Sequence, residues 1–224
     1  MNVPVQSTPF LGEGYWRNIL SQEEMQSIEW PKKVPEPVEE ILDRQDPFAP
    51  QQLMRHSYMV LYVPKIDLHN FGSIAAKVCA LLQIRRQQFP MIDGSPPVTD
   101  PVENEIDRTT LTGRCWIIIR KEPLEITNLG ELNQIFGANQ GLPTAAEMVL
   151  FSQKIRSYYQ QDNDVFRALT ENKYEGSFVT VGVQNAGTEL TVNRWDLEID
   201  QDSLLAYPCL RYTDAKPKSE SKEQ

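Results

Sequence analysis

The sequence contains few of the residues from which metal sites and nucleophilic sites are built. Its 224 residues include only two histidines, His56 and His69, and three cysteines, Cys79, Cys115 and Cys209. None of them has a partner at the spacing of a helical metal site or a C-x-x-C motif, so we expect no metal. An odd number of well-separated cysteines cannot all pair within one chain, which excludes a disulfide scaffold and favours a reducing compartment.

Glycine-rich loops that bind phosphate are also missing. Gly12 and Gly14 are followed by Tyr15 and Trp16, where a dinucleotide-binding fingerprint needs a third glycine and a helix. The sequence has neither the P-loop pattern G-x-x-x-x-G-K-S/T nor the G-x-S-x-G pattern of serine hydrolases. We therefore expect no cofactor.

Positive charge and long apolar runs are scarce as well. There are 22 lysines and arginines against 31 aspartates and glutamates, a formal net charge of -9, which argues against a nucleic-acid partner. No apolar run approaches the roughly 20 residues that cross a bilayer, and residues 1–16 lack the features of a signal peptide. We expect no membrane insertion and a cytoplasmic location, with export without a cleavable signal peptide as the alternative.

The clearest local signal that is present is the start of a helix. Thr144 and Glu147 have the capping-box spacing, in which each side chain accepts a backbone N–H of the first helical turn. The apolar residues that follow recur at steps of three and four, which predicts one apolar stripe: Met148, Phe151, Ile155, and Tyr158 or Tyr159. The β-branched runs at residues 115–119 and 178–183 are typical of core strands, so we expect this helix to cover a sheet.

Weaker signals predict the other elements. The remaining strands are expected at residues 58–63, 109–121, 177–183, 189–192, 204–207 and 210–212, the last two being edge pieces separated by Pro208. The remaining helices are expected after the capping box of Ser21 and Glu24, at 73–86, at 129–136 with Gly137 as a left-handed cap, and after Asp162 with Val165, Phe166 and Leu169. Residues 90–101 are expected to form a loop.

These elements predict an α+β fold with a mixed, mainly antiparallel sheet covered by two longer helices. Seven of the sixteen prolines lie in residues 1–50, which predicts an extended N-terminal arm. A single domain is expected at residues 51–213 and a disordered charged tail at 214–224.

Two groups of residues are candidates for binding a protein partner. Four carboxylates alternate along one segment, which would align them on one face of a strand: Asp196, Glu198, Asp200 and Asp202. A solvated acidic face or a weak cation site are the alternatives for this acidic ladder. Tyr15 and Trp16 are large apolar residues in a polar region, where they either anchor the arm on the domain or form an exposed partner site.

One resemblance rests on two short motifs. The sequence has L-P-T-x-x-E at Leu142, Pro143, Thr144 and Glu147, followed by a helix, strands and a terminal C-x-R at Cys209 and Arg211. This order resembles the closing half of bacterial C-type-lectin-like domains related to the formylglycine-generating enzyme, over roughly seventy residues. That family has more tryptophan and glycine between the two motifs. The resemblance implies a display or binding domain.

Two hypotheses on function remain open. The first is a non-enzymatic protein–protein interaction module that uses the N-terminal arm, the acidic ladder, or both. The second is an enzyme of unrecognised family, a hydrolase that uses acidic residues and His69. The lack of any catalytic motif favours the first hypothesis.

Overall fold

The computed structural model describes residues 10–64, 71–86, 106, 115–158, 166–184, 189–195 and 204–213. These residues form helices and mixed, mainly antiparallel sheets, which confirms the predicted α+β class. The two longest helices are α5 (Phe71–Leu82) and α8 (Ala145–Tyr158). The acidic ladder, the 90–101 loop and the 214–224 tail lie outside the described residues.

The first sheet has four strands in the order β1-β4-β6-β12. Their bounds are Phe10–Leu11 for β1, Tyr58–Val63 for β4, Cys115–Arg120 for β6 and Cys209–Thr213 for β12. All six residues of β6 are buried, because this strand has neighbours on both edges and packed layers on both faces. The prediction that the apolar run at 115–119 forms a central strand is confirmed.

The second sheet has six strands in the order β5-β10-β9-β8-β11-β7. Their bounds are Arg85–Arg86 for β5, Glu189–Trp195 for β10, Ser177–Gln184 for β9, Phe166–Tyr174 for β8, Leu204–Ala206 for β11 and Leu124–Ile126 for β7. The predicted antiparallel pair of 177–183 with 189–192 is present as β9 and β10. A separate two-stranded sheet joins β2 (Gln45–Asp46) and β3 (Ala49–Leu53).

Strand β8 stands where a short helix was predicted after Asp162, so that prediction is wrong for the described residues. Ala168 packs in the core beside α8, whereas Leu169 packs in a second cluster on the other side of the sheet. Burial on both faces hides the period of two that normally marks a strand. The turn to β9 uses positive φ at Glu175 (48°) and Gly176 (85°), as in a type I′ hairpin, although glutamate is not a typical residue there.

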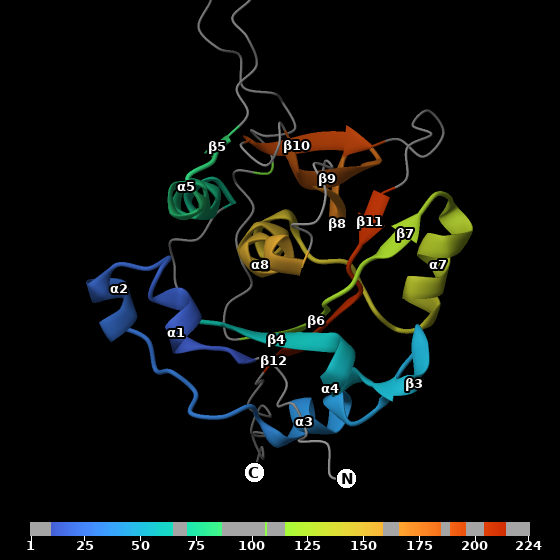
Figure 1. The fold of residues 1–224 in the computed structure, drawn as a ribbon, viewed down its shortest axis with the longest axis horizontal. Helices are drawn as coiled ribbons and strands as arrows, with labels where there is room; N and C mark the ends of the chain where they lie inside the picture. Colours follow the sequence, from blue (N-terminus) through green and yellow to red (C-terminus); the bar gives the residue numbers. More distant parts are fainter. Residues whose placement is uncertain are drawn as a thin grey trace, which may run out of the picture.

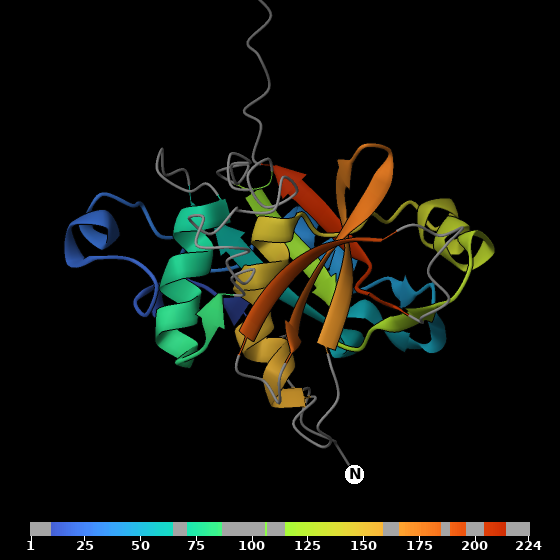
Figure 2. The same cartoon turned by 90° about the horizontal axis from the view of Figure 1, so that it is seen from above.

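Helix α8 lies between the two sheets, and α5 packs beside it (Figures 1 and 2). Its capping box is confirmed: the Thr144 N–H donates to Glu147 Oε2 (2.7 Å) and the Glu147 N–H donates to Thr144 Oγ1 (3.1 Å). Residues 145–152 are at most 3% exposed on every side of the helix. For residues 145–152 the prediction of a single apolar stripe is therefore wrong, because this part of the helix is enclosed between two layers and has no solvent face.

Two helices end on a left-handed residue that is not glycine. Helix α5 ends at Leu82 before Gln83 (φ 55°), and α7 (Leu129–Gly137) ends before Asn139 (φ 56°). In each case the next N–H donates back five residues, from Ile84 to Cys79 and from Gln140 to Ile135, which is a Schellman-type ending. The predictions of a Gly137 cap and of a helix reaching residue 86 are wrong.

Residues 10–50 belong to the core and do not form an extended arm. They contain the helices α1 (Glu13–Trp16), α2 (Gln22–Gln26) and α3 (Glu36–Leu42). Trp16, Val38 and Leu42 have no exposed surface and pack in the same clusters as β4 and β6. The prolines here help to start elements, since Pro35 is the N-cap of α3 and Pro37 lies in its first turn.

The first sheet thus has packed layers on both faces. Its upper face meets α5 and α8, and its lower face meets α3 and α4 (Met54–Ser57) (Figure 1). In the described part of the chain, no helix is long and apolar enough to span a membrane.

Pro208 marks the point where the chain passes from one sheet to the other. Strand β11 before it lies between β8 and β7 inside the second sheet, whereas β12 after it forms an edge of the first sheet. The edge prediction is therefore confirmed for residues 210–212 and wrong for residues 204–207.

Candidate functional site

The acidic ladder has only its two flanks in the described structure. Strand β10 ends at Trp195 and β11 begins at Leu204, so Asp196, Glu198, Asp200 and Asp202 fall between them, outside the described residues. Their role in binding a partner stays a prediction.

Tyr15 and Trp16 are buried, at 8% and 0% exposure. The Trp16 Nε1–H donates to the Tyr62 carbonyl (2.7 Å), and the Tyr15 hydroxyl donates to the Leu150 carbonyl in α8. Burial raises the pKa of the Tyr15 hydroxyl. Both side chains anchor α1 in the core, so the partner-binding role assigned to them is corrected: a side chain enclosed by its own fold offers no surface to a partner.

The three cysteines are poor candidates for nucleophiles. Cys79, Cys115 and Cys209 are all buried. Burial, with the nearby charge of Glu147, raises the pKa of the Cys115 thiol to about 12, and burial also raises the pKa of Cys209. A thiol with a raised pKa carries little of the reactive thiolate at neutral pH. These residues behave as small apolar groups.

The neighbourhood of His56 holds a serine and a lysine but no catalytic arrangement. The Lys121 Nζ donates to the His56 carbonyl (2.7 Å), and the Lys121 N–H donates to the Ser57 carbonyl (2.8 Å). Burial lowers the pKa of Lys121. However, the Ser57 hydroxyl is inaccessible and has no hydrogen-bond partner among the described residues, so it cannot meet a substrate. His69 lies outside the described residues, and within them no cluster of metal-ligating side chains occurs.

A partly buried ion pair joins the start of α8 to β12. Arg211 donates from Nε to Glu147 Oε1 (2.9 Å) and from Nη2 to Glu147 Oε2 (2.5 Å), a bidentate pair. Its other contacts are from Nη2 to the Leu142 carbonyl (3.1 Å) and from Nη1 to Glu171 Oε2 (3.0 Å) on β8. Burial alone would lower the pKa of Arg211, but the Glu147 carboxylate raises it and keeps the guanidinium charged. This ion pair fixes β12 to α8 and β8.

The same ion pair connects the two motifs behind the lectin-like resemblance. Glu147 closes the first motif and Arg211 closes the second, and Gly141 forms a bridge to Cys209. Such contacts also follow from the need of any buried carboxylate for a cationic partner. The resemblance therefore stays a prediction.

A second polar cluster is enclosed at the other end of β6. Asp46 has no exposed surface and faces Arg120, whose Nε lies 3.4 Å from Asp46 Oδ2. Nearby, the buried Tyr58 hydroxyl lies within hydrogen-bond distance of both side-chain atoms of Gln140 (2.9 and 3.0 Å). Burial raises the pKa of Tyr58. The groups satisfy one another inside the fold, so the cluster is structural.

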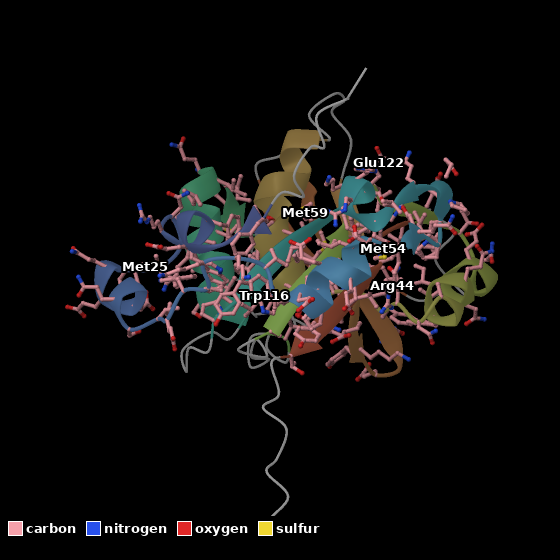
Figure 3. All side chains as sticks on the ribbon, turned by 90° about the horizontal axis from the view of Figure 1, so that it is seen from below. Met25, Arg44, Met54, Met59, Trp116 and Glu122 are labelled. Atoms are coloured by element: carbon pink, nitrogen blue, oxygen red, sulfur yellow. The ribbon has the colours of Figure 1, made fainter. Side chains whose placement is uncertain are left out.

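An aromatic row crosses the lower face of the first sheet. Tyr62, Trp116 and Tyr212 lie directly opposite one another on β4, β6 and β12. The ring centroids of Tyr62 and Trp116 are 5.0 Å apart, and Phe10 lies 5.4 Å from Trp116. Trp116 is buried beside α3, as Figure 3 shows from below, whereas both tyrosines are half-buried. The row thus ends in a partly exposed tyrosine on the edge strand.

On the β4 side of this sheet, the short strand β1 is the edge strand and covers part of β4. Strand β1 runs parallel to β4, with Phe10 opposite Val60 and Leu11 opposite Leu61. The backbone of Tyr62 also faces away from β6, and its carbonyl accepts the indole N–H of Trp16. Strand β1 and the Trp16 side chain therefore cover the side of β4 that faces away from β6.

The other edge is formed by β12, whose backbone direction follows from one contact. The Arg120 N–H donates to the Pro208 carbonyl (2.9 Å), so Pro208 turns its backbone toward β6. Backbone groups in an antiparallel strand alternate in direction. The residues of β12 that turn their N–H and C=O away from β6 are therefore Cys209, Arg211 and Thr213.

Within the described residues, this edge has a backbone partner only at its first residue. Cys209 exchanges two backbone hydrogen bonds with Gly141, both 2.9 Å. For Arg211 and Thr213, no backbone partner on that side occurs within the described part of the chain. Thr213 is exposed. We call residues 211–213 the open edge.

Comparison with protein-family models, with curated proteins and with solved structures found no match.

The open edge and the aromatic row were missed as functional candidates from the sequence. The alternation of Leu210, Arg211 and Tyr212 is the local signal that could have indicated a strand with one apolar face. The pairing of Tyr212 with Trp116, far away in the sequence, has no local signal.

Proposed function

We propose that the protein is a protein–protein interaction module and that its contact surface includes the open edge with Leu210 and Tyr212. The observation that carries this proposal is that Arg211 and Thr213 have no outward backbone partner among the described residues and lie beside half-buried apolar side chains. Natural proteins usually cover or block such an edge, since it can pair with another chain. Here β1 covers the outward side of β4, whereas Arg211 and Thr213 have no outward backbone partner within the described part of the chain.

The polar interior is consistent with this proposal. The buried charged groups Glu147 and Asp46 are each paired with an arginine inside the fold, and the described cysteines have no reactive environment. The lectin-like resemblance, with its implied display or binding role, points the same way. The acidic ladder is a second candidate surface.

Affinity capture with matched variants tests the proposal. The full chain is used as wild type, as Tyr212→Ala and as Phe136→Ala, and the proteins captured from the source cell are quantified by mass spectrometry. Phe136 is a 45% exposed aromatic residue on α7, so Phe136→Ala controls for nonspecific binding through exposed apolar side chains. A partner in near-stoichiometric amount should be retained by the wild type and Phe136→Ala, and lost from Tyr212→Ala.

The acidic ladder is tested in the same experiment with Glu198→Gln combined with Asp200→Asn. Loss of the partner from this variant alone would assign the contact surface to the acidic ladder. Identical protein sets for all variants, or no stoichiometric partner for the wild type, would contradict the proposal.

A further inference from the structure

We propose that the open edge binds an extended segment of another protein as an added β-strand, with a basic residue opposite Arg211 and an apolar residue on each side of it. This inference rests on the proposed function and specifies the partner's chemistry and mode of binding.

The backbone supplies the docking groups. Arg211 and Thr213 each turn one N–H and one C=O away from β6, so a neighbouring strand finds two donors and two acceptors in β-sheet geometry. Cys209 already uses both of its outward groups on Gly141. The added segment would therefore begin where the Gly141 bridge stops and would continue the same sheet.

The lower face selects apolar residues. Side chains of an added strand alternate between the two faces, and those beside Leu210 and Tyr212 fall on the lower face. Both residues are half-buried and pack against the cluster that contains Trp116. An apolar side chain there would extend the aromatic row by one strand and shield Tyr212 from water.

The upper face selects a basic residue. Arg211 already holds Glu147 through two nitrogens and Glu171 through the third, so this group has two carboxylates and one guanidinium. The Glu171 side chain is 44% exposed and shares its one guanidinium with Glu147. An acidic partner residue would add a third carboxylate. A lysine or arginine would balance the charge.

A second copy of this chain fits less well as the occupant. Self-pairing through the open edge would bring together two chains that each carry a net charge of -9. A basic segment of another protein is instead attracted to that charge.

Peptide binding to the full chain tests the inference. The probe is a fluorescein-labelled Val-Lys-Val-Lys-Val-Lys-Val peptide, compared with a peptide that has glutamate for lysine and with one that has the same residues in blocks. We expect the alternating basic peptide to bind at least about tenfold more tightly than either comparison peptide, as measured by fluorescence anisotropy.

The variants Thr213→Pro and Thr213→Ala separate strand addition from simple charge attraction. Proline removes the outward N–H but leaves the pairing with β6, because that N–H does not point to β6. We expect Thr213→Pro to weaken binding by about fivefold or more, and Thr213→Ala by less than about twofold. Urea melts of both variants check that the fold is intact.

Several outcomes would overturn the inference. Equal binding of the alternating and block peptides, or no effect of Thr213→Pro in a folded protein, would show that only net charge attracts the peptide. A concentration-dependent dimer in sedimentation, abolished by Thr213→Pro, would assign the edge to a second copy. If peptides fail to bind but Tyr212→Ala still loses its captured partner, strand addition is wrong and the proposed function stands.

Discussion

The two sides of the four-stranded sheet differ in how the outward backbone groups of β4 and β12 are covered. On the β4 side, β1 and the Trp16 indole cover the outward backbone groups, and Trp16 itself is fully buried. On the β12 side, the Gly141 bridge covers only Cys209, and an ion pair on the upper face holds the strand in place. An uncovered sheet edge can pair with a strand of another chain. Among the described residues, the outward groups of β4 thus have partners, whereas those of Arg211 and Thr213 do not.

The largest effect is expected on the β4 side. Trp16→Ala removes a fully buried side chain and leaves the Tyr62 carbonyl without its donor, which should destabilise the protein by about 3 to 5 kcal/mol in urea melts. Trp16→Phe keeps most of the apolar contact and should lose clearly less. A loss below about 1 kcal/mol for Trp16→Ala would mean that the cover of β4 does not depend on this residue.

The next effect concerns the ion pair that holds β12. Glu147→Gln leaves Arg211 without its bidentate partner, and we expect a loss of about 2 to 4 kcal/mol in the same melts. Glutamine can still act at the third position of a capping box, so the loss would report the ion pair and not the helix cap. Glu131→Gln, in the exposed capping box of α7, is the matched control and should change stability much less. Equal losses would contradict this explanation.

Hydrogen exchange should distinguish inward from outward groups on the open edge. We expect the amides of Arg211 and Thr213 to exchange at least about tenfold faster than those of Leu210 and Tyr212, which turn toward β6. Two-dimensional NMR of the full chain measures this directly. Equal protection of all four amides would mean that another segment already covers this edge.

The smallest effect is expected away from both edges, in the β8–β9 turn. Glu175 has a left-handed backbone, which asparagine adopts more readily, so Glu175→Asn should stabilise the protein by about 0.5 kcal/mol. The exposed ion pair of Glu175 with Arg194 contributes little that would be lost. Glu175→Ala lacks the asparagine preference and should not stabilise. A loss of stability with asparagine would show that the ion pair outweighs the backbone effect.

The β8–β9 hairpin and the candidate site depend on contacts that have no local signal in the sequence. Strand β8 was predicted as a helix because Asp162 and Asp164 offered a cap before Val165, Phe166 and Leu169. Burial of residues 168–170 hides the strand alternation there, and the turn at Glu175 lacks the usual Asn-Gly or Asp-Gly signal. Burial of Tyr15 and Trp16 followed from contacts with Leu150 and Tyr62, which lie far away in the sequence. For the candidate site, the sequence predicted only an edge strand at residues 210–212.

The sequence by itself determined what depends on neighbours within a few positions. The capping boxes at Ser21 and Thr144 and the strand run at 115–119 rest on such contacts, and all three are present in the structure. Only the tertiary structure decided that residues 145–152 of α8 are enclosed on all sides, and that Pro208 separates strands of two different sheets. It also decided that β1 and Trp16 cover β4, whereas Arg211 and Thr213 have no outward backbone partner among the described residues. Those properties depend on which distant segments meet, and local spacing carries no information about that choice.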